Sequence, residues 1–420
     1  MRSANTALIL AALVAMVPGA AAALTLDEAI AAAREHAPAL ARADAMSRVT
    51  EGAYRVARAG ARPAGVLEGS VGVARLDPQQ FFGLSAADTT PRSAAVSIEQ
   101  PIYAGGAISG PIAAARADRA AARAGIEAVQ AELVAEVVRA YADVVVGGRR
   151  IAQYRGLETD LVEVARQARL KFQAGEVPST DMAQAEARLA EARAGISQVN
   201  GALAVARAHF RTLTGLEAND LAPFPAPPPT PAAREAAVAQ ALANNPSLAR
   251  AQAAVEGADA RARASGAEGL PKVTGFARVS TTRDQFFPGY AADEAVIGVR
   301  ARWTFLDGGR AAGQRSEARA QRDIALADLR AAQDAVTEAA ISGFEALRTA
   351  GEVRIAARAQ DDASRRALHD VRLEVQAGAK PQLALLDTER DAIAAATRAA
   401  AADANVLIAA YSLRAVLGEQ

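Results

Sequence analysis

The sequence contains no cysteine and few aromatic residues. Among 420 residues, phenylalanine, tryptophan and tyrosine together make up only 4%. Disulfide bonds are therefore excluded, as is a lipid anchor on an N-terminal cysteine, so packing alone must hold the chain together. Hydrophobic residues nevertheless reach 51%, and much of that is alanine, which is the best helix former and carries little bulk. This composition favours long helices that approach each other closely over a thick aromatic core.

An excess of charge of either sign is also missing. The 47 basic residues equal the 47 acidic ones in number. Arg2 is the only charged residue among residues 1–23. Removal of these residues would leave 46 basic residues against 47 acidic ones and a net charge of −1. Such a balance gives no electrostatic reason to expect nucleic acid as a partner.

The first 23 residues are typical of a signal peptide. Arg2 gives a short positive region, and the eleven residues 7–17 form an apolar run that Pro18 and Gly19 end. Three alanines, 21–23, then supply a small-residue cleavage site, so we expect cleavage after Ala23. A buried N-terminal helix is the alternative. No apolar stretch of about 18 residues follows, so we expect no transmembrane helix in the rest of the chain.

The chain carries an internal duplication. Pro101–Gly106 (PIYAGG) resembles Thr304–Gly309 (TFLDGG), and Lys171–Gly175 (KFQAG) resembles Glu374–Gly378 (EVQAG). A third pair of motifs surrounds two further glycines, and every glycine pair is 203 residues apart: Gly105 and Gly308, Gly175 and Gly378, Gly215 and Gly418. Three motifs with one offset predict two structural repeats. We assign residues 24–216 to the first repeat, 217–232 to a stiff proline-rich linker, and 233–420 to the second repeat.

Each repeat predicts the same order of elements. An alanine-rich helix, Asp27 to about Ala59 in the first repeat, begins after the N-cap Thr25 and precedes two segments of alternating polarity that are typical of strands. We expect residues 76–92 and 283–293 to be the loops between paired strands. The turns Gly105–Gly106 and Gly308–Gly309 then open very long helices. After tip turns at Gly175 to Pro178 and Gly378 to Pro381, shorter helices return.

The helix lengths predict a bundle with all strands at one end. Residues 107–173 would span roughly 100 Å as one helix, whereas each return helix and each first helix is about half as long. Two short helices stacked end to end match one long helix. We therefore predict an α+β fold that is mainly α. Its four strands are long enough to cross an outer membrane but too few to close a barrel, so they either pair in water or are pooled by several chains.

The order and duplication of these motifs resemble the TolC-like outer-membrane efflux family. The similarity rests on Leu24–Ile30 (LTLDEAI), the following Ala-Pro-Ala-Leu, the two Gly-Gly turns and the two glycine tip turns, and it covers essentially the whole chain after residue 23. It implies a homotrimer whose twelve strands form a β-barrel in outer-membrane lipid, above an α-helical tunnel in the periplasm. It also implies a periplasmic adaptor (membrane fusion) protein and an inner-membrane transporter of the ABC or RND type, in tripartite efflux or type I secretion.

The same resemblance implies a periplasmic gate. Asp181, six residues after Gly175, takes the place of an acidic link residue, and Lys380 takes the place of its basic partner. Asp387 matches an acidic position that lines the narrow end as a ring. Two departures are Ala384, where a second acidic ring residue is common, and Val375, which replaces an aromatic residue. The tip turns, with Gly175, Pro178, Gly378 and Pro381, would contact the adaptor.

The residues give no sign of chemistry. His36, His209 and His369 are isolated, with no second histidine or cysteine at ligand spacing. We find no catalytic constellation and expect no cofactor, no metal and no enzymatic activity. Two alternatives remain, a periplasmic adaptor and a structural envelope protein without a pore. An adaptor needs one helical hairpin flanked by other domains, whereas this chain predicts two hairpins.

Overall fold

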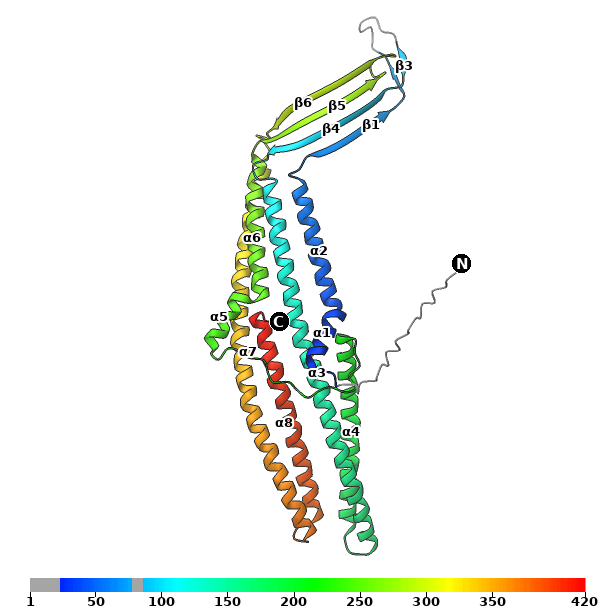
Figure 1. Cartoon of the computed structure of the whole chain (residues 1–420), viewed down its shortest axis with the longest axis vertical. Helices are drawn as coiled ribbons and strands as arrows, with labels where there is room; N and C mark the ends of the chain where they lie inside the picture. Colours follow the sequence, from blue (N-terminus) through cyan, green and yellow to red (C-terminus); the bar gives the residue numbers. More distant parts are fainter. Residues whose placement is uncertain (1–22, 78–85, 420) are drawn as a thin grey trace, which may run out of the picture. The chain divides into compact units, whose positions relative to one another are not determined.

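A computed structural model describes residues 23–77 and 86–419, without the side chains of residues 382 and 383. The predicted signal peptide, except Ala23, and part of the predicted loop 76–92 lie outside these residues. The first repeat contains the following elements (Figure 1): α1 Leu26–His36, α2 Pro38–Ala59, β1 Ala64–Val71, β2 Ala74–Leu76, β3 Ala87–Thr89, β4 Arg92–Tyr103, α3 Ser109–Gln173 and α4 Ser179–Thr214.

The second repeat runs through the same order (Figure 1): α5 Arg234–Asn244, α6 Pro246–Gly266, β5 Lys272–Arg283, β6 Ala291–Arg302, α7 Arg310–Gln376 and α8 Gln382–Leu417. A single 3-10 turn, Ala267–Gly269, separates α6 from β5. The predicted fold class is confirmed, since helices dominate and the strands form one antiparallel sheet of four and one of two.

The first predicted helix is wrong in one respect, because it is two helices. Pro38 cannot continue a helix through its own nitrogen, so α1 ends at His36 and α2 starts with Pro38 in its first turn. Its predicted start is correct. The Thr25 and Glu28 side chains each accept from the other residue's backbone N–H, at 3.3 Å and 2.8 Å, which makes a reciprocal capping box.

The predicted loops are also partly wrong. The predicted loop 76–92 begins at the last residue of β2 and contains β3, and these two short strands pair with each other. The second loop is shorter than predicted, because Arg283 pairs with Ala291 and Asp293 pairs with Thr281. Residues 284–290 form that loop.

The duplication extends to backbone angles. Four pairs of glycines that are 203 residues apart, all in turns, have positive φ, in the region that favours glycine. The φ values are 59° and 66° at Gly105 and Gly308, 109° and 89° at Gly106 and Gly309, 75° and 71° at Gly175 and Gly378, and 72° and 76° at Gly215 and Gly418.

Compact units of the fold cut across the repeats. One unit contains residues 1–36, 137–226 and 353–407, and the other contains residues 37–136, 227–352 and 408–420. We call them the tip unit, which holds both tip turns, and the sheet unit, which holds both strand pairs. Each unit is therefore built from both copies of the duplicated sequence.

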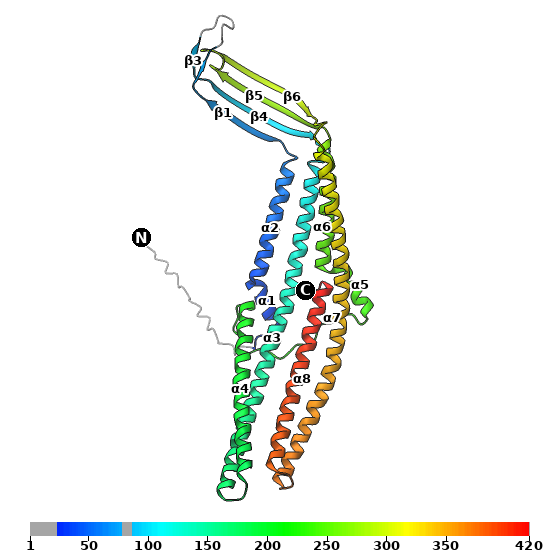
Figure 2. The same ribbon diagram turned by 180° about the vertical axis from the view of Figure 1, so that it is seen from behind.

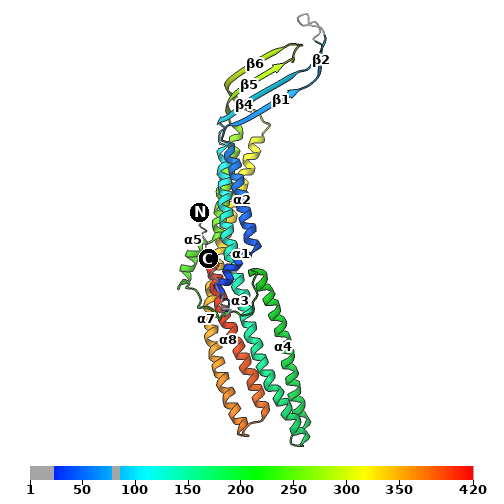
Figure 3. The ribbon, with the colours of Figure 1, turned by 45° about the vertical axis from the view of Figure 1, so that its right-hand side comes forward.

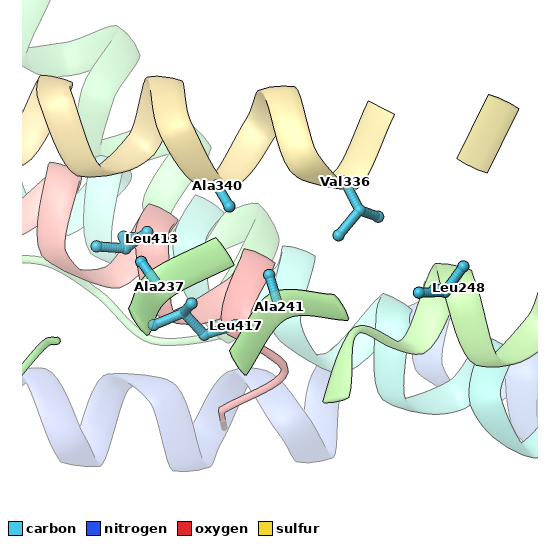
Figure 4. Packing of buried hydrophobic residues seen from close by; sticks show 7 residues of the cluster. All are labelled: Ala237, Ala241, Leu248, Val336, Ala340, Leu413 and Leu417. Atoms are coloured by element: carbon cyan, nitrogen blue, oxygen red, sulfur yellow. The ribbon is translucent and has the colours of Figure 1, made fainter. Parts of the chain in front are cut away.

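The sheet unit has a small-residue core (Figure 4). The side chains come from α5, α6, α7 and α8, and all of them except Leu248 and Val336 have no exposed surface. The cluster consists of Ala237, Ala241, Leu248, Val336, Ala340, Leu413 and Leu417. Alanine lets helices come close, as the composition predicts.

The sheet of four strands has the order β1-β4-β5-β6, with every neighbouring pair antiparallel (Figure 2). Strands β4, β5 and β6 have twelve residues each and β1 has eight. Because β1 and β6 lie at the two ends of this order, each has one side without a strand partner among the described residues.

In the tip unit, α3 with α4 and α7 with α8 form two helical hairpins (Figure 3). Leu161 of α3, Ala185 and Ala192 of α4 and Leu386 of α8 belong to one buried cluster, so the hairpins contact each other. Tyr141 of α3 is fully buried. Its hydroxyl donates a hydrogen bond to the backbone carbonyl of Ala222 at 2.7 Å or that of Leu24 at 3.0 Å.

By length and composition, one helix of the described chain could cross a membrane: Ala384–Leu417 in α8. Alanine raises the mean hydropathy of this stretch, although charged residues interrupt it. Its contacts are those of a packed helix. Asp403 pairs with Arg358 of α7 at 2.7 Å, and Ala399 and Ala402 are buried with Ala357.

Candidate functional site

One face of the four-stranded sheet is apolar and exposed. Leu67, Val96, Val279 and Ala295 are register partners across all four strands, and the next row on this face ends at Ile297. Leu67 is 77% exposed and Ile297 is 86% exposed. Soluble proteins rarely expose such a continuous apolar surface, and it is the surface that hydrocarbon would cover.

The opposite face is polar. Arg300 of β6 pairs with Glu99 of β4 at 3.3 Å, and its guanidinium lies 4.9 Å from the centroid of the Phe276 ring. Ser70 and Ser93 share a hydrogen bond of 2.8 Å between β1 and β4. The period-two alternation predicted from the sequence therefore yields a sheet with one lipid-compatible face and one water-compatible face.

Aromatic side chains mark the end of the sheet next to α7. Trp303 and Phe305 follow β6 directly, are 60% and 81% exposed, and have ring centroids 6.3 Å apart. The indole Nε1 donates to the Gly269 carbonyl at 3.1 Å. Exposed aromatic residues at a strand end are typical of the interface between lipid and water.

The strand-to-helix turns differ between the repeats. Gly105 and Gly106 lie between β4 and α3, and Gly308 and Gly309 lie between β6 and α7. Only the second turn has a capping carboxylate, because Asp307 accepts from the backbone N–H groups of Gly309 at 2.9 Å and Ala311 at 2.8 Å. These hydrogen bonds lower the pKa of Asp307.

The two tip turns have the same geometry. After Gly175, the Glu176 N–H donates back to the Lys171 carbonyl at 2.8 Å, and after Gly378 the Ala379 N–H donates to the Glu374 carbonyl at 2.8 Å. These bonds span a glycine of positive φ, which ends each long helix in a Schellman motif. Pro178 and Pro381 then directly precede the returning helices.

The predicted gate residues lie near these turns but have other partners within the chain. Lys380 Nζ lies 2.7 Å from Glu374 Oε2, and Asp181 Oδ1 accepts from the Thr180 hydroxyl at 3.5 Å. Asp387 Oδ1 lies 3.5 Å from Arg188 Nη2, which joins α8 to α4. In the described part of the chain, Asp181 and Lys380 do not pair.

One carboxylate near the tip is buried, which the sequence did not predict. Glu389 of α8 is only 5% exposed, and its Oε1 accepts from Arg372 of α7 at 3.0 Å while Oε2 has no hydrogen bond. Asp160 of α3 lies 3.9 Å from the same guanidinium. Burial raises the pKa of Glu389, and the charge of Asp160 adds to this effect, whereas Arg372 opposes it.

The described residues contain no group of three or more histidine or acidic side chains placed to hold a metal ion. The residues that do gather are structural and electrostatic: an amphipathic sheet, glycine turns, and charged helix ends.

Comparison with known proteins gives the same result for both repeats. The family model described as "Outer membrane efflux protein" matches residues 29–216 and 237–419. The outer membrane efflux protein BepC of Brucella suis biovar 1 (strain 1330) is 28% identical over 323 residues, which are 76% of this chain and 70% of that protein.

Solved channels have the same fold. The Campylobacter jejuni CmeC outer membrane channel matches with a TM-score of 0.82 at 13% identity, over 94% of this chain and 85% of that one. The open state of the Neisseria gonorrhoeae MtrE outer membrane channel gives 0.78 at 19% identity, over 94% and 89%. The outer-membrane channel OprN gives 0.81 at 21% identity, over 94% and 90%.

The resemblance inferred from the sequence motifs is thereby confirmed. The family model covers both halves of the chain, and the solved channels share the arrangement of a strand-bearing part and long helical hairpins. This chain belongs to the outer membrane efflux protein family and is an efflux protein of the outer membrane.

Proposed function

We propose that three copies of this chain form one channel, in which each contributes β1, β4, β5 and β6 to a closed twelve-stranded barrel and its helices to a periplasmic tunnel. The observation that carries this proposal is the exposed apolar face of a sheet whose two edge strands, β1 and β6, each have one unpaired edge among the described residues. We also propose that the mature chain begins at Leu24, after cleavage behind Ala23.

Backbone groups are the reason for assembly. In hydrocarbon, every N–H and C=O must find a partner, so the outer edges of β1 and β6 are not tolerated in lipid by a single chain. The smallest single-chain barrels have about eight strands, which is more than one copy supplies. Pairing of β1 with β6 of the next copy satisfies all edges, and the family resemblance favours three copies.

The channel acts as a passive conduit with no chemistry of its own. In the proposed assembly, a periplasmic adaptor protein contacts the tip turns around Gly175, Pro178, Gly378 and Pro381, and an inner-membrane transporter of the ABC or RND type drives the cargo.

The gate closes only on assembly. Within one chain, Lys380 pairs with Glu374 and not with Asp181. We therefore propose that Asp181 meets Lys380 of a neighbouring copy. Asp387 from three copies then forms the constriction. An exposed ion pair contributes only about 0–1 kcal/mol, which suits a latch that an adaptor must open.

Cysteine cross-linking tests the barrel, because the chain has no cysteine of its own. Val66→Cys on β1 is combined in turn with Glu294→Cys, Val296→Cys and Gly298→Cys on β6. We expect at least one combination to give oxidised species of two and three chains on denaturing gels of outer membranes.

The control pair is Ser97→Cys with Arg278→Cys, which are register partners on β4 and β5. It cross-links within one chain and leaves the chain mass unchanged. A membrane-extracted protein that stays monomeric in mild detergent would end the trimer proposal. Release of the protein by carbonate washing would instead favour an adaptor or a structural protein without a pore.

A further inference from the structure

The tip unit contains a cavity that the conduit does not need. It has a volume of about 560 Å³ and lies between the α3–α4 hairpin and α8. Cavities of roughly 300–1,000 Å³ are the size that takes small organic molecules. Its lining comes from α3 and α4, which form one hairpin, and from α8, which is far from them in the sequence, so the packing of the two hairpins creates it.

The floor of the cavity is apolar. Leu161, Ala192 and Leu386 line it and are at most 5% exposed. Gly195 makes room for an aromatic wall, since a Cβ at this position would lie 2.5 Å from Cε1 of the Tyr154 ring. The apolar floor and this ring offer a surface for the apolar body of a ligand.

The rim of the cavity is strongly basic. Arg150 from α3, Arg188 from α4, and Arg390 and Arg398 from α8 line it, against one acidic side chain, Glu191. Arg188 is engaged, with Nη1 3.0 Å from Glu191 and Nη2 3.5 Å from Asp387.

The other arginines are not neutralised. Over the described ranges, neither Arg390 nor Arg398 has a carboxylate within ion-pairing distance. The Arg150 guanidinium lies 5.9 Å from the centroid of the Tyr154 ring, which places a further positive charge above the aromatic wall. Positive charges that converge on a concave apolar surface concentrate anions there.

We propose that this cavity binds a small organic anion with an aromatic or other apolar body and two acidic groups. The guanidinium groups recognise carboxylate, sulfonate or phosphate oxygens through paired hydrogen bonds, while the ring and the leucines cover the apolar body. The bound anion bridges arginines of the α3–α4 hairpin and of α8. It therefore fastens the two hairpins to each other, which a conduit alone does not require.

Calorimetry on the full-length assembly in a non-ionic detergent tests this, with naphthalene-1,5-disulfonate as the probe. We expect saturable binding that weakens about tenfold or more in the double variant Arg390→Gln/Arg398→Gln, because the two unpaired charges are lost. About 0.5 M NaCl should weaken it as well, since screening then acts within a few Å.

Matched variants separate the site from general charge. Arg207→Gln removes an exposed charge of α4 that does not line the cavity, and it should leave binding unchanged. Ala394→Trp fills the cavity with every arginine in place and should abolish binding. Arg390→Lys/Arg398→Lys should bind more tightly than the glutamine pair. Size-exclusion chromatography and circular dichroism verify the fold of each variant.

Equal affinity of the wild type and the glutamine pair would overturn the proposal, as would equally tight binding of 1-naphthylmethylammonium or no binding by an intact assembly. Conductance in planar bilayers is measured on the same samples. A conducting channel that binds no disulfonate overturns this inference and leaves the proposed function standing. A sample that binds the anion but forms no channel overturns the proposed function and leaves this inference standing.

Discussion

The two tip hairpins contain the same ion pair in two environments. Arg169 and Glu186 join α3 to α4 at 2.5 Å, and Arg372 and Glu389, each 203 residues further on, join α7 to α8 at 3.0 Å. The glutamate side chain is 41% exposed in the first pair but only 6% exposed in the second. The repeated sequence therefore gave the same local contact, whereas packing against other helices decided whether the carboxylate remained in water.

This difference shows what a duplication conserves. Glycine turns and pairs one helical hairpin apart depend on local geometry, and both copies keep them. Burial depends on which neighbour covers a helix face, and here the copies diverge. Asp160 of the first hairpin lies 3.9 Å from Arg372 of the second ion pair but is not a partner of the first ion pair, Arg169 with Glu186. Substitutions at matched positions of the two repeats can test this distinction.

The largest contrast should come from the glycines that end α4 and α8. Both have φ near 75°, which costs roughly 1–2 kcal/mol for alanine. At Gly418 a Cβ would also lie 2.2 Å from the Asn244 carbonyl oxygen, whereas at Gly215 it would lie 3.0 Å from the movable His36 ring. We expect Gly418→Ala to destabilise by more than about 3 kcal/mol or to prevent folding, and Gly215→Ala by about 1–2 kcal/mol.

Denaturant unfolding followed by circular dichroism measures both variants. Equal losses of stability would show that the backbone angle alone matters and that the close approach of α8 to the end of α5 does not.

A smaller contrast should come from Tyr141 and its counterpart, Phe344. The Tyr141 hydroxyl is buried and lies within hydrogen-bonding distance of two backbone carbonyls, and burial raises its pKa to about 12, so it stays protonated at ordinary pH. Tyr141→Phe removes the hydroxyl that donates to the Ala222 carbonyl, whereas the Leu24 carbonyl keeps the backbone N–H of Ala222 at 2.9 Å. The variant should cost about 1–3 kcal/mol.

Phe344→Tyr is the reciprocal variant. Phe344 packs against the apolar cluster of Figure 4, where a hydroxyl gains no equivalent bond. A Tyr141→Phe protein as stable as the wild type would mean that the hydroxyl does not hold the linker.

The caps of α2 and α6 give the next contrast. Asn245 accepts from the N–H groups of Ser247 at 2.9 Å and Leu248 at 3.2 Å, and it donates to the Val416 carbonyl at 2.8 Å. The matching cap of α2, Ala37, has no side-chain hydrogen bond. Asn245→Ala should lower the free energy of unfolding by about 1 kcal/mol. Ala37→Asn should add a cap to α2 and raise the free energy of unfolding by part of that amount. Thermal unfolding of both single variants and the double variant measures this, and no loss in Asn245→Ala contradicts it.

Glu389 should make stability depend on pH, in a direction fixed by its raised pKa. A carboxyl whose folded pKa is raised contributes stability that is fully present below its unfolded pKa and is lost as pH rises through the folded pKa. Glu389→Gln should therefore be more stable than the wild type at neutral pH, and this gain should shrink in acid. The melting temperature as a function of pH is the measurement, with Glu186→Gln as the matched variant, and an identical profile for wild type and Glu389→Gln contradicts it.

The smallest energies belong to the proposed latch, although its effect on conductance is visible. The counterparts of Lys380 and Asp181 are Val177 and Ala384, so each repeat supplies one half of the pair. Lys380→Glu should raise single-channel conductance in planar bilayers, and Asp181→Lys added to it should restore closure. Unchanged conductance in both proteins would remove the latch from the proposal.

Most of the fold could be predicted because its signals are local. Alternation gave the strands, the 203-residue offset gave the duplicated turns, and Thr25 with Glu28 gave the start of α1. The break at Pro38 could also have been found, because proline cannot continue a helix. The alanine-rich sequence on both sides favours helix and concealed it.

The site was less accessible, because its properties arise between distant segments. No spacing predicts that Glu389 becomes buried beside Asp160, or that Arg188 binds Asp387 199 residues away. The cavity lies between two hairpins and depends on Gly195 admitting the Tyr154 ring. The partner that Lys380 finds in its own chain, Glu374, is six residues away and could have been considered from the sequence.

The unequal strand lengths have a consequence for how the proposed barrel would come apart. β1 has eight residues and β6 has twelve, so the ladder between two protomers is shorter than the ladders that join β4, β5 and β6 within one chain. Under force or heat, the three short ladders between protomers would separate before the strands within any one chain do. The proposed assembly should then separate into single chains whose own strands remain paired, and the same short ladders would be the last to form when newly exported chains close the barrel.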